Sequence, residues 1–257
     1  MDAGDISQNF LGGLFVFCLL SFYLYESIFP KREKGRRFSE RTLANINIFL
    51  LSLLFATFCK VVLITVFSEK IVNIPSIDIR ILPILLQFLI VVFLLEGINY
   101  YFHRLSHSIN FLWRFHKVHH SDKVLDIFTY FRHHPIEVLF SSFVILLFVE
   151  LFSLPIIMVS IYLVLNNIFQ VFQHSNIRIP QLSTSFLNRY FITPDLHAEH
   201  HLKDRKRSDT NYGTILTIFD KVHKTYALPG SKSEYGIAEN EYFGERIDSL
   251  LLMPFKK

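Results

Sequence analysis

Charged residues and cysteines are both scarce in this chain of 257 residues. Asp, Glu, Lys and Arg make up only 19% of it, whereas 51% of the residues are hydrophobic and the mean hydropathy is +0.35. A soluble domain of this length rarely needs so much apolar surface, so the composition favours a compact membrane bundle. Cys18 and Cys59 both lie inside apolar stretches. This placement indicates buried thiols and argues against a disulfide, a C-x-x-C redox pair or a zinc knot.

The chain also lacks internal repeats, low-complexity linkers and an obvious targeting signal. The first apolar segment has no basic region before it and no small-x-small cleavage site, so we expect a membrane span and not a signal peptide. We expect a single domain over residues 1–257. The net charge of +4 indicates basic residues beside a membrane, and no nucleic-acid partner is expected.

Five apolar segments predict an all-α, integral membrane helical bundle. Each of the first three has roughly the 20 residues that a helix needs to cross the hydrocarbon core. The last two are shorter and Pro155 lies between them, so we expect a helical hairpin that turns at residues 153–155. The prediction is therefore four to five membrane segments with a histidine-rich helical cap. The segments cover about residues 10–29, 46–67, 79–102, 136–151 and 154–172.

The basic residues predict how the bundle is oriented. Six of them fall in residues 31–41, and the positive-inside rule puts this loop in the cytoplasm. Alternating the segments then puts residues 68–78 outside and all histidines on the cytoplasmic side. In the absence of a targeting signal, we favour a bacterial inner membrane over the endoplasmic reticulum. The six residues are Lys31, Arg32, Lys34, Arg36, Arg37 and Arg41.

Histidine is the residue whose number is unusual, with 12 copies that fall mostly in short clusters. Spacings of three and four put side chains on one helix face, where neutral imidazoles can bind one metal ion. In each H-x-x-H-H motif the middle histidine points aside and can reach a neighbouring ion. Nine imidazoles are too many for one ion, so we expect two, and imidazole suits iron, zinc, copper and nickel alike. The candidate ligands are His103, His107, His116, His119, His120, His174, His197, His200 and His201; all except His174 are also expected to be essential for catalysis.

These motifs resemble the fatty acid hydroxylase/sterol desaturase superfamily of membrane di-iron enzymes, over about residues 80–230. The sequence departs from the family pattern at residues 219–225, where members usually have Trp-Asp and Phe-Gly-Thr. The matching segments are His103-x3-His107, Trp113-Arg-Phe-His116-Lys-Val-His119-His120-Ser121, Arg132-His133-His134-Pro135, His197-Ala-Glu-His200-His201 and Asp209-Thr-Asn211-Tyr212-Gly213; the departing ones are Phe219-Asp220 and His223-Lys-Thr225.

The resemblance implies a catalytic core over about residues 80–230 that holds two iron ions, which zinc could replace on overexpression. It implies hydroxylation or desaturation, by O2, of a lipid: a sterol, a fatty acyl chain, a sphingolipid or an alkylglycerol. No fused cytochrome b5 domain is visible in the sequence. We therefore expect two electrons from a separate donor, either cytochrome b5-like or ferredoxin-like.

Several polar residues are candidates for contacting a ligand or the substrate. Glu96 shares a helix face with His103, and could either orient an imidazole or make a structural hydrogen bond. His133 and His134 precede a proline and could cap the next helix, and the resemblance makes His134 the better functional candidate. His223 is expected at the surface. The full set of candidates is Glu96, His134, Asn167, Gln170 and Asn211.

Two other functions remain open on the sequence. A membrane metal transporter would also be rich in histidine, but it would place ionisable residues along a path near the bilayer midplane. A zinc-dependent membrane hydrolase would need a carboxylate base, for which Glu199 is the candidate. The basic residues at 203–207 are either a solvated loop near anionic lipid headgroups or a docking patch for an acidic electron donor.

Overall fold

The computed structural model describes residues 3–32, 39–71, 77–230 and 234–256, and these residues form helices and no β-strand. The predicted all-α class is confirmed. The long helices are α1 (Ala3–Ile28), α2 (Glu40–Ile71), α3 (Ile84–Ser108), α5 (Pro135–Leu151) and α6 (Ile156–His174). The short ones are η1 (Ile79–Ile81), α4 (Asn110–His120), η2 (Ile127–Phe131), α7 (Gln181–Leu187), α8 (Pro194–His200), α9 (Arg205–Ser208), α10 (Ile218–Val222), α11 (Ile247–Leu252) and η3 (Met253–Phe255).

Four of the long helices have the length and apolar composition to cross a membrane. Their outward faces carry large exposed apolar side chains such as Phe17, Leu54 and Leu85, as helices that face lipid do. The chain is therefore an integral membrane protein. Helix α5 has 17 residues and is shorter than a typical span. The four candidate spans are Asn9–Ile28, Glu40–Val62, Ile84–Ser108 and Ile156–His174.

The third span differs in position from the sequence prediction. It begins at Ile84, because Pro83 precedes the helix and the residues before it form the separate turn η1. It also continues to Ser108, so both His103 and His107 lie on the membrane helix itself. The predicted hairpin is present: α5 ends at Leu151 and α6 begins after Pro155.

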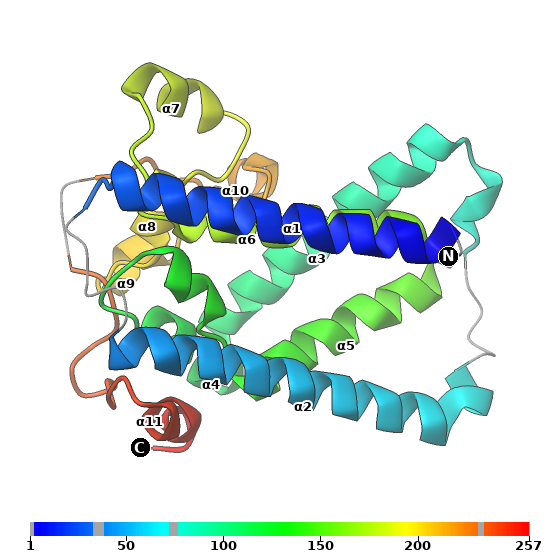
Figure 1. Cartoon of the computed structure of the whole chain (residues 1–257), viewed down its shortest axis with the longest axis horizontal. Coiled ribbons are helices and arrows are strands. Elements are labelled where there is room, and N and C mark those ends of the chain that lie inside the picture. The colour runs from blue at the N-terminus through cyan, green and yellow to red at the C-terminus, as the bar shows by residue number, and fades with distance from the viewer. Residues whose placement is uncertain (1–2, 33–38, 72–76, 231–233, 257) are drawn as a thin grey trace.

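The histidine-bearing elements gather at one end of the bundle (Figure 1). Helix α1 lies along α6 and α2 packs along α5, while α4, α8 and α9 lie at the same end, where α3 finishes and α5 starts. The histidine-bearing segments therefore lie at one end of the spans and not along their length. Part of the predicted basic loop (Lys34, Arg36 and Arg37) lies outside the described residues, as do residues 72–76 of the opposite loop.

A buried ionic network fixes the polar end of the bundle. Arg41, at the start of α2, pairs with Asp122 at 2.6 Å and also with Asp126, which caps η2. Arg132 donates from Nε to the Val118 carbonyl oxygen, near the end of α4. Loss of one partner from such a buried pair typically costs about 3–5 kcal/mol. The network therefore holds η2 and the end of α4 firmly against α2.

Candidate metal centre

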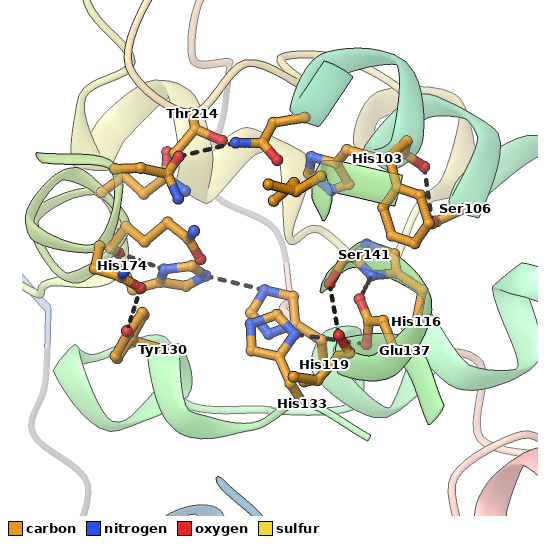
Figure 2. A pocket seen from close by; sticks show the side chains of 18 of the residues that line it. His103, Ser106, His116, His119, Tyr130, His133, Glu137, Ser141, His174 and Thr214 are labelled. Carbon is orange, nitrogen blue, oxygen red and sulfur yellow. Dashed lines mark hydrogen bonds and ion pairs between the residues drawn. The ribbon is translucent and has the colours of Figure 1, made fainter. Parts of the chain in front are cut away.

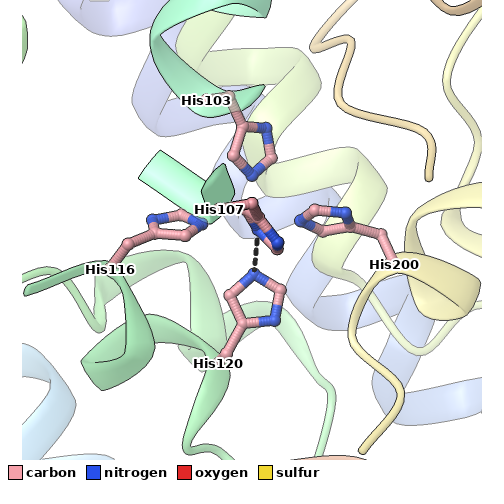
Figure 3. A group of neighbouring side chains, drawn as sticks. All are labelled: His103, His107, His116, His120 and His200. Carbon is pink, nitrogen blue, oxygen red and sulfur yellow. Dashed lines mark hydrogen bonds between the residues drawn. The ribbon is translucent and has the colours of Figure 1, made fainter. Parts of the chain in front are cut away.

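The structure brings together all nine histidines that were predicted as ligands, in two groups. Within each group, one ring nitrogen of every member lies within 4.8 Å of the others. In each H-x-x-H-H motif the first and third histidines belong to one group and the middle histidine belongs to the other. This division agrees with the expectation that the middle side chain points aside on the helix. Group 1 contains His103, His107, His116, His120 and His200 (Figure 3), and group 2 contains His119, His174, His197 and His201.

Local signals place the helices that carry these side chains. Helix α8 starts where Thr193 accepts a hydrogen bond from the Leu196 N–H and Pro194 occupies the first turn, a favourable N-terminal arrangement. Helix α4 follows α3 after a break at Ile109, whose backbone is extended. This break turns α4 so that its H-x-x-H-H motif meets the end of α3.

The ring nitrogens of two group 2 histidines meet in a way that no hydrogen bond can explain. His119 Nδ1 donates to the Arg132 carbonyl oxygen at 3.2 Å, and His174 Nδ1 donates to the Gln170 carbonyl oxygen at 2.6 Å. A carbonyl oxygen only accepts, so both Nδ1 atoms carry the proton and both Nε2 atoms carry a lone pair. These two Nε2 atoms lie 3.0 Å apart (Figure 2). A cation between them would turn this repulsion into binding.

Group 1 shows the same pattern with different acceptors. His103 Nδ1 donates to the Tyr212 carbonyl oxygen at 2.8 Å, and His200 Nδ1 donates to the Thr210 carbonyl oxygen at 2.7 Å. The Nε2 atoms of both rings are buried and have no hydrogen-bond partner. Buried polar atoms are normally satisfied, so these lone pairs fit a bound metal ion.

Two carboxylates orient further imidazoles of group 1. Asp209 accepts from His107 Nδ1 at 3.0 Å, and Glu137 Oε1 accepts from His116 Nδ1 at 2.6 Å. Carboxylate partners of this kind fix the ring and raise the basicity of a metal ligand. The sequence reasoning did not find Glu137. The available signal was a carboxylate within an apolar helical segment, which is costly unless it has a partner.

Burial keeps the imidazoles of His119, His200 and His201 neutral. Removal from water is the main cause that lowers the pKa of His119 and His201 well below the usual value, and neighbouring imidazoles lower it further. For His200 the same causes lower the pKa to about 3. Metal ions bind only the neutral ring, so the site is in its binding form at neutral pH.

The structure reverses the expected roles of the two adjacent histidines. His134 caps α5, since its Nδ1 accepts from the Ile136 N–H, and it packs against Phe115 away from the cavity. His133 instead stacks on His119, with ring centroids 4.3 Å apart and planes at 10°. The extended backbone before Pro135 turns successive side chains in different directions. The correction is therefore that His133, and not His134, contacts the histidine groups.

Two other candidates hold residues 209–227, here called the tail, in place. Glu96 touches no imidazole: one carboxylate oxygen accepts from the backbone N–H groups of Thr214, Ile215 and Leu216, and the other accepts from Tyr162. The structural alternative for Glu96 is thus the one observed. Asn211, at a positive φ of 53°, donates to the carbonyl oxygens of residues 196 and 227, and so joins α8 to the tail.

A cavity of about 260 Å3 adjoins both histidine groups. Asn167 and Gln170 line it, as predicted from their helix face, together with His103, His119 and His174. In Figure 2, His174 and His119 meet across the cavity wall while Glu137 lies beside His116. The cavity therefore gives a small molecule access to the histidine nitrogens.

The basic run at 203–207 is largely neutralised within the chain. Lys203 pairs with Glu234 and Glu239, and Arg205 stacks on Trp113 with its charge 3.9 Å from the ring centre. Arg207 binds both carboxylate oxygens of Glu199, at 2.6 and 2.9 Å. These pairs favour the solvated-loop interpretation, and they leave Glu199 poorly placed to act as a hydrolytic base.

Comparison with known proteins matches residues 88–225 to the family described as fatty acid hydroxylase. Alkylglycerol monooxygenase of Homo sapiens is 30% identical over 138 residues, which cover 54% of this chain and 30% of that protein. The ornithine lipid hydroxylase OlsE of Rhizobium tropici is 30% identical over 158 residues, or 62% of this chain and 47% of that protein. Lathosterol oxidase of Homo sapiens is 28% identical over 134 residues, or 51% and 42%.

The aligned regions span less than half the length of each of these relatives. The family match begins within α3 and ends after α10, so it contains every histidine of the two groups. No solved structure gives a match to the chain.

Proposed function

Because the chain belongs to the fatty acid hydroxylase family, we propose that it is a membrane-bound, non-haem di-iron oxygenase that hydroxylates or desaturates a lipid. The names of its relatives describe a monooxygenase, a hydroxylase and an oxidase of three different lipids. The candidate substrates remain a sterol, a fatty acyl chain, a sphingolipid and an alkylglycerol. The single observation that supports the proposal most is the contact of His119 and His174 through two lone pairs, which calls for a cation.

The two groups have the ligands that two transition-metal ions need. Group 1 offers five imidazoles and group 2 offers four, within the four to six ligands that such ions take. Iron is the metal of the proposal, with zinc a possible substitute in overexpressed protein, because imidazole itself does not select between them. When bound, two iron ions would supply the reduction of O2 and the attack on a C–H bond.

The protein's own residues have three tasks in this reaction. Backbone carbonyls and the carboxylates of Asp209 and Glu137 hold the imidazoles in one tautomer and orientation. The packed helices bury eight of the nine histidines, which limits the amount of water around their ring nitrogens. The adjoining cavity holds the lipid so that one carbon lies near the metal positions. In hydroxylation one oxygen atom of O2 enters the C–H bond, and the other leaves as water with two electrons and two protons.

The proposal is tested with protein purified in detergent, loaded with iron and supplied with a chemical reductant and a lipid extract. We expect close to two metal ions per chain, together with lipid oxidation, detected by mass spectrometry, that depends on O2. His119→Ala is expected to abolish oxidation. His223→Ala is the matched control, because His223 is partly exposed and bonds Tyr101 outside the histidine groups. Equal oxidation by both variants would overturn the proposal.

We place the histidine end in the cytoplasm of a bacterial inner membrane, where a separate cytochrome b5-like or ferredoxin-like donor would supply electrons. The support is the described basic residues Lys31, Arg32 and Arg41, which lie between α1 and the first turn of α2, at the end of the bundle where α4 and α8 lie. Cysteines introduced singly at position 77 and at position 206 test this topology with a membrane-impermeant reagent. Labelling of both from the same side would contradict it.

A further inference from the structure

Side-chain amides line one wall of the cavity beside the histidine groups. Asn99 lies one turn before His103 on α3, and the remaining amides lie on α6. Their spacing of three or four residues places them on the face of α6 that carries His174. The row consists of Asn99, Asn166, Asn167, Gln170 and Gln173, and all five line the cavity.

Part of the cavity lining is apolar. Phe49 of α2, Ile145 of α5 and Leu163 of α6 contribute to it, and all three helices face lipid elsewhere on their surfaces. The volume of about 260 Å3 is just below the 300–1,000 Å3 of pockets that enclose a whole drug-sized ligand. The cavity therefore encloses only part of a lipid, and its lining offers both polar and apolar contacts.

Three of the five side-chain amides, those of Asn99, Asn166 and Asn167, are hydrogen-bonded within the protein, whereas the buried oxygen of Gln173 has no partner. Asn99 donates to Tyr162 and Asn166, and Asn167 accepts from Tyr130. Gln173 is only 4% exposed, and its Oε1 atom has no hydrogen-bond partner. An unpaired buried acceptor is costly. Its position in the cavity lining indicates that a ligand supplies the missing donor.

We infer that the substrate is a lipid with a hydroxyl or amide N–H group close to the carbon that is oxidised, and that Gln173 accepts a hydrogen bond from this group. This inference rests on the proposed function and narrows its substrate class. A methylene far along a hydrocarbon chain would place only C–H groups against the amide row and leave Gln173 unsatisfied. A fully esterified lipid offers acceptors but no donor. Both are therefore poor substrates, and the apolar residues of the lining contact the hydrocarbon that follows the polar group.

The test uses pairs of lipids that differ only in whether they carry hydroxyl groups, two in the first pair and one in the second. One pair is 1-O-hexadecylglycerol and hexadecyl propyl ether, and the other is a 3-hydroxysterol and its 3-deoxy analogue. For the pair that iron-loaded protein oxidises, we expect kcat/KM to be about 10- to 100-fold higher for the hydroxylated member, as for sites built to bind a hydroxyl. Fragmentation mass spectrometry is expected to place the oxidised carbon within a few bonds of the hydroxyl.

Gln173→Leu provides the second arm of the test. It replaces the unpaired acceptor by an apolar side chain, so the preference for the hydroxylated member should shrink at least tenfold while the metal content stays the same. Gln181→Leu is the matched control, since Gln181 is exposed at the start of α7, and it should keep the wild-type preference.

Binding separates failure of this inference from failure of the proposed function. Absence of lipid oxidation with both metals bound would count against the oxygenase proposal alone. The inference is then judged by thermal stabilisation in detergent, where the hydroxylated member should stabilise wild-type protein more than its partner and Gln173→Leu should remove the difference. Equal stabilisation by both members, including none, would overturn the inference. So would equal turnover of both members or oxidation at a remote methylene.

Discussion

Glu96 is expected to hold the tail of the chain, and replacing it should loosen one histidine group before the other. The side chain is 1% exposed and binds the N–H groups of residues 214, 215 and 216 at 3.3, 2.7 and 2.9 Å. Two residues earlier, the Tyr212 carbonyl oxygen accepts from His103 of group 1. Movement of this loop would therefore release His103, whereas the partners of group 2 lie on other segments.

The size of the effect follows from the hydrogen bonds. Glu96→Leu would leave three buried N–H groups without an acceptor, at about 1–3 kcal/mol each, or about 3–9 kcal/mol in all. This is comparable with the whole stability of a typical domain, about 5–15 kcal/mol. Glu96→Gln keeps an oxygen for the N–H groups but loses the charge, so we expect a cost of about 2–3 kcal/mol and a fall in Tm of about 4–12 °C.

Thermal unfolding in detergent and metal analysis provide the assay. We expect Glu96→Gln to keep both metals at a lower Tm, and Glu96→Leu to lose one metal per chain or to unfold. Glu150→Leu is the control, because Glu150 is exposed near the end of α5 and should change stability by about 0.5 kcal/mol or less. If Glu96→Leu and Glu150→Leu have the same Tm and metal content, the reasoning about the tail is wrong.

Three further predictions concern the histidines. His119→Ala should remove one metal ion per chain from group 2, and His120→Ala should remove one from group 1. If metal analysis finds that neither variant loses an ion, the two-site interpretation is wrong. His134→Ala should cost about 1 kcal/mol, because it removes a helix cap, and should leave both metals in place, as Tm and metal content would show. Burial lowers the folded-state pKa of His200 to about 3, so below pH 6.5 the unfolded chain binds protons that the folded chain does not. The free energy of unfolding of metal-free protein should therefore be highest above pH 6.5 and fall as the pH drops toward 3. The same stability to denaturant at about pH 7 and about pH 4.5 would contradict this prediction.

Much of the histidine centre was predictable because its motifs are local. Residues three and four apart share a helix face in any α-helix, so the motifs containing His116 and His197 could be recognised without a structure. The same geometry predicted that the middle residues His119 and His200 turn toward a different partner. Residues that the motifs do not contain were harder to find. Glu137 meets His116 only because α5 packs against α4.

The amino-acid sequence by itself determined the membrane-spanning helices, the hairpin and the histidine motifs, because hydrophobic length and helical period are properties of short segments. Only the tertiary structure decided that His174 joins group 2 and that Glu96 binds a loop 118 residues later in the chain. It also decided that His133, and not His134, stacks on His119. These contacts join residues on different helices. Their partners depend on how the helices pack and on which buried polar groups need satisfying, and no local pattern contains that information.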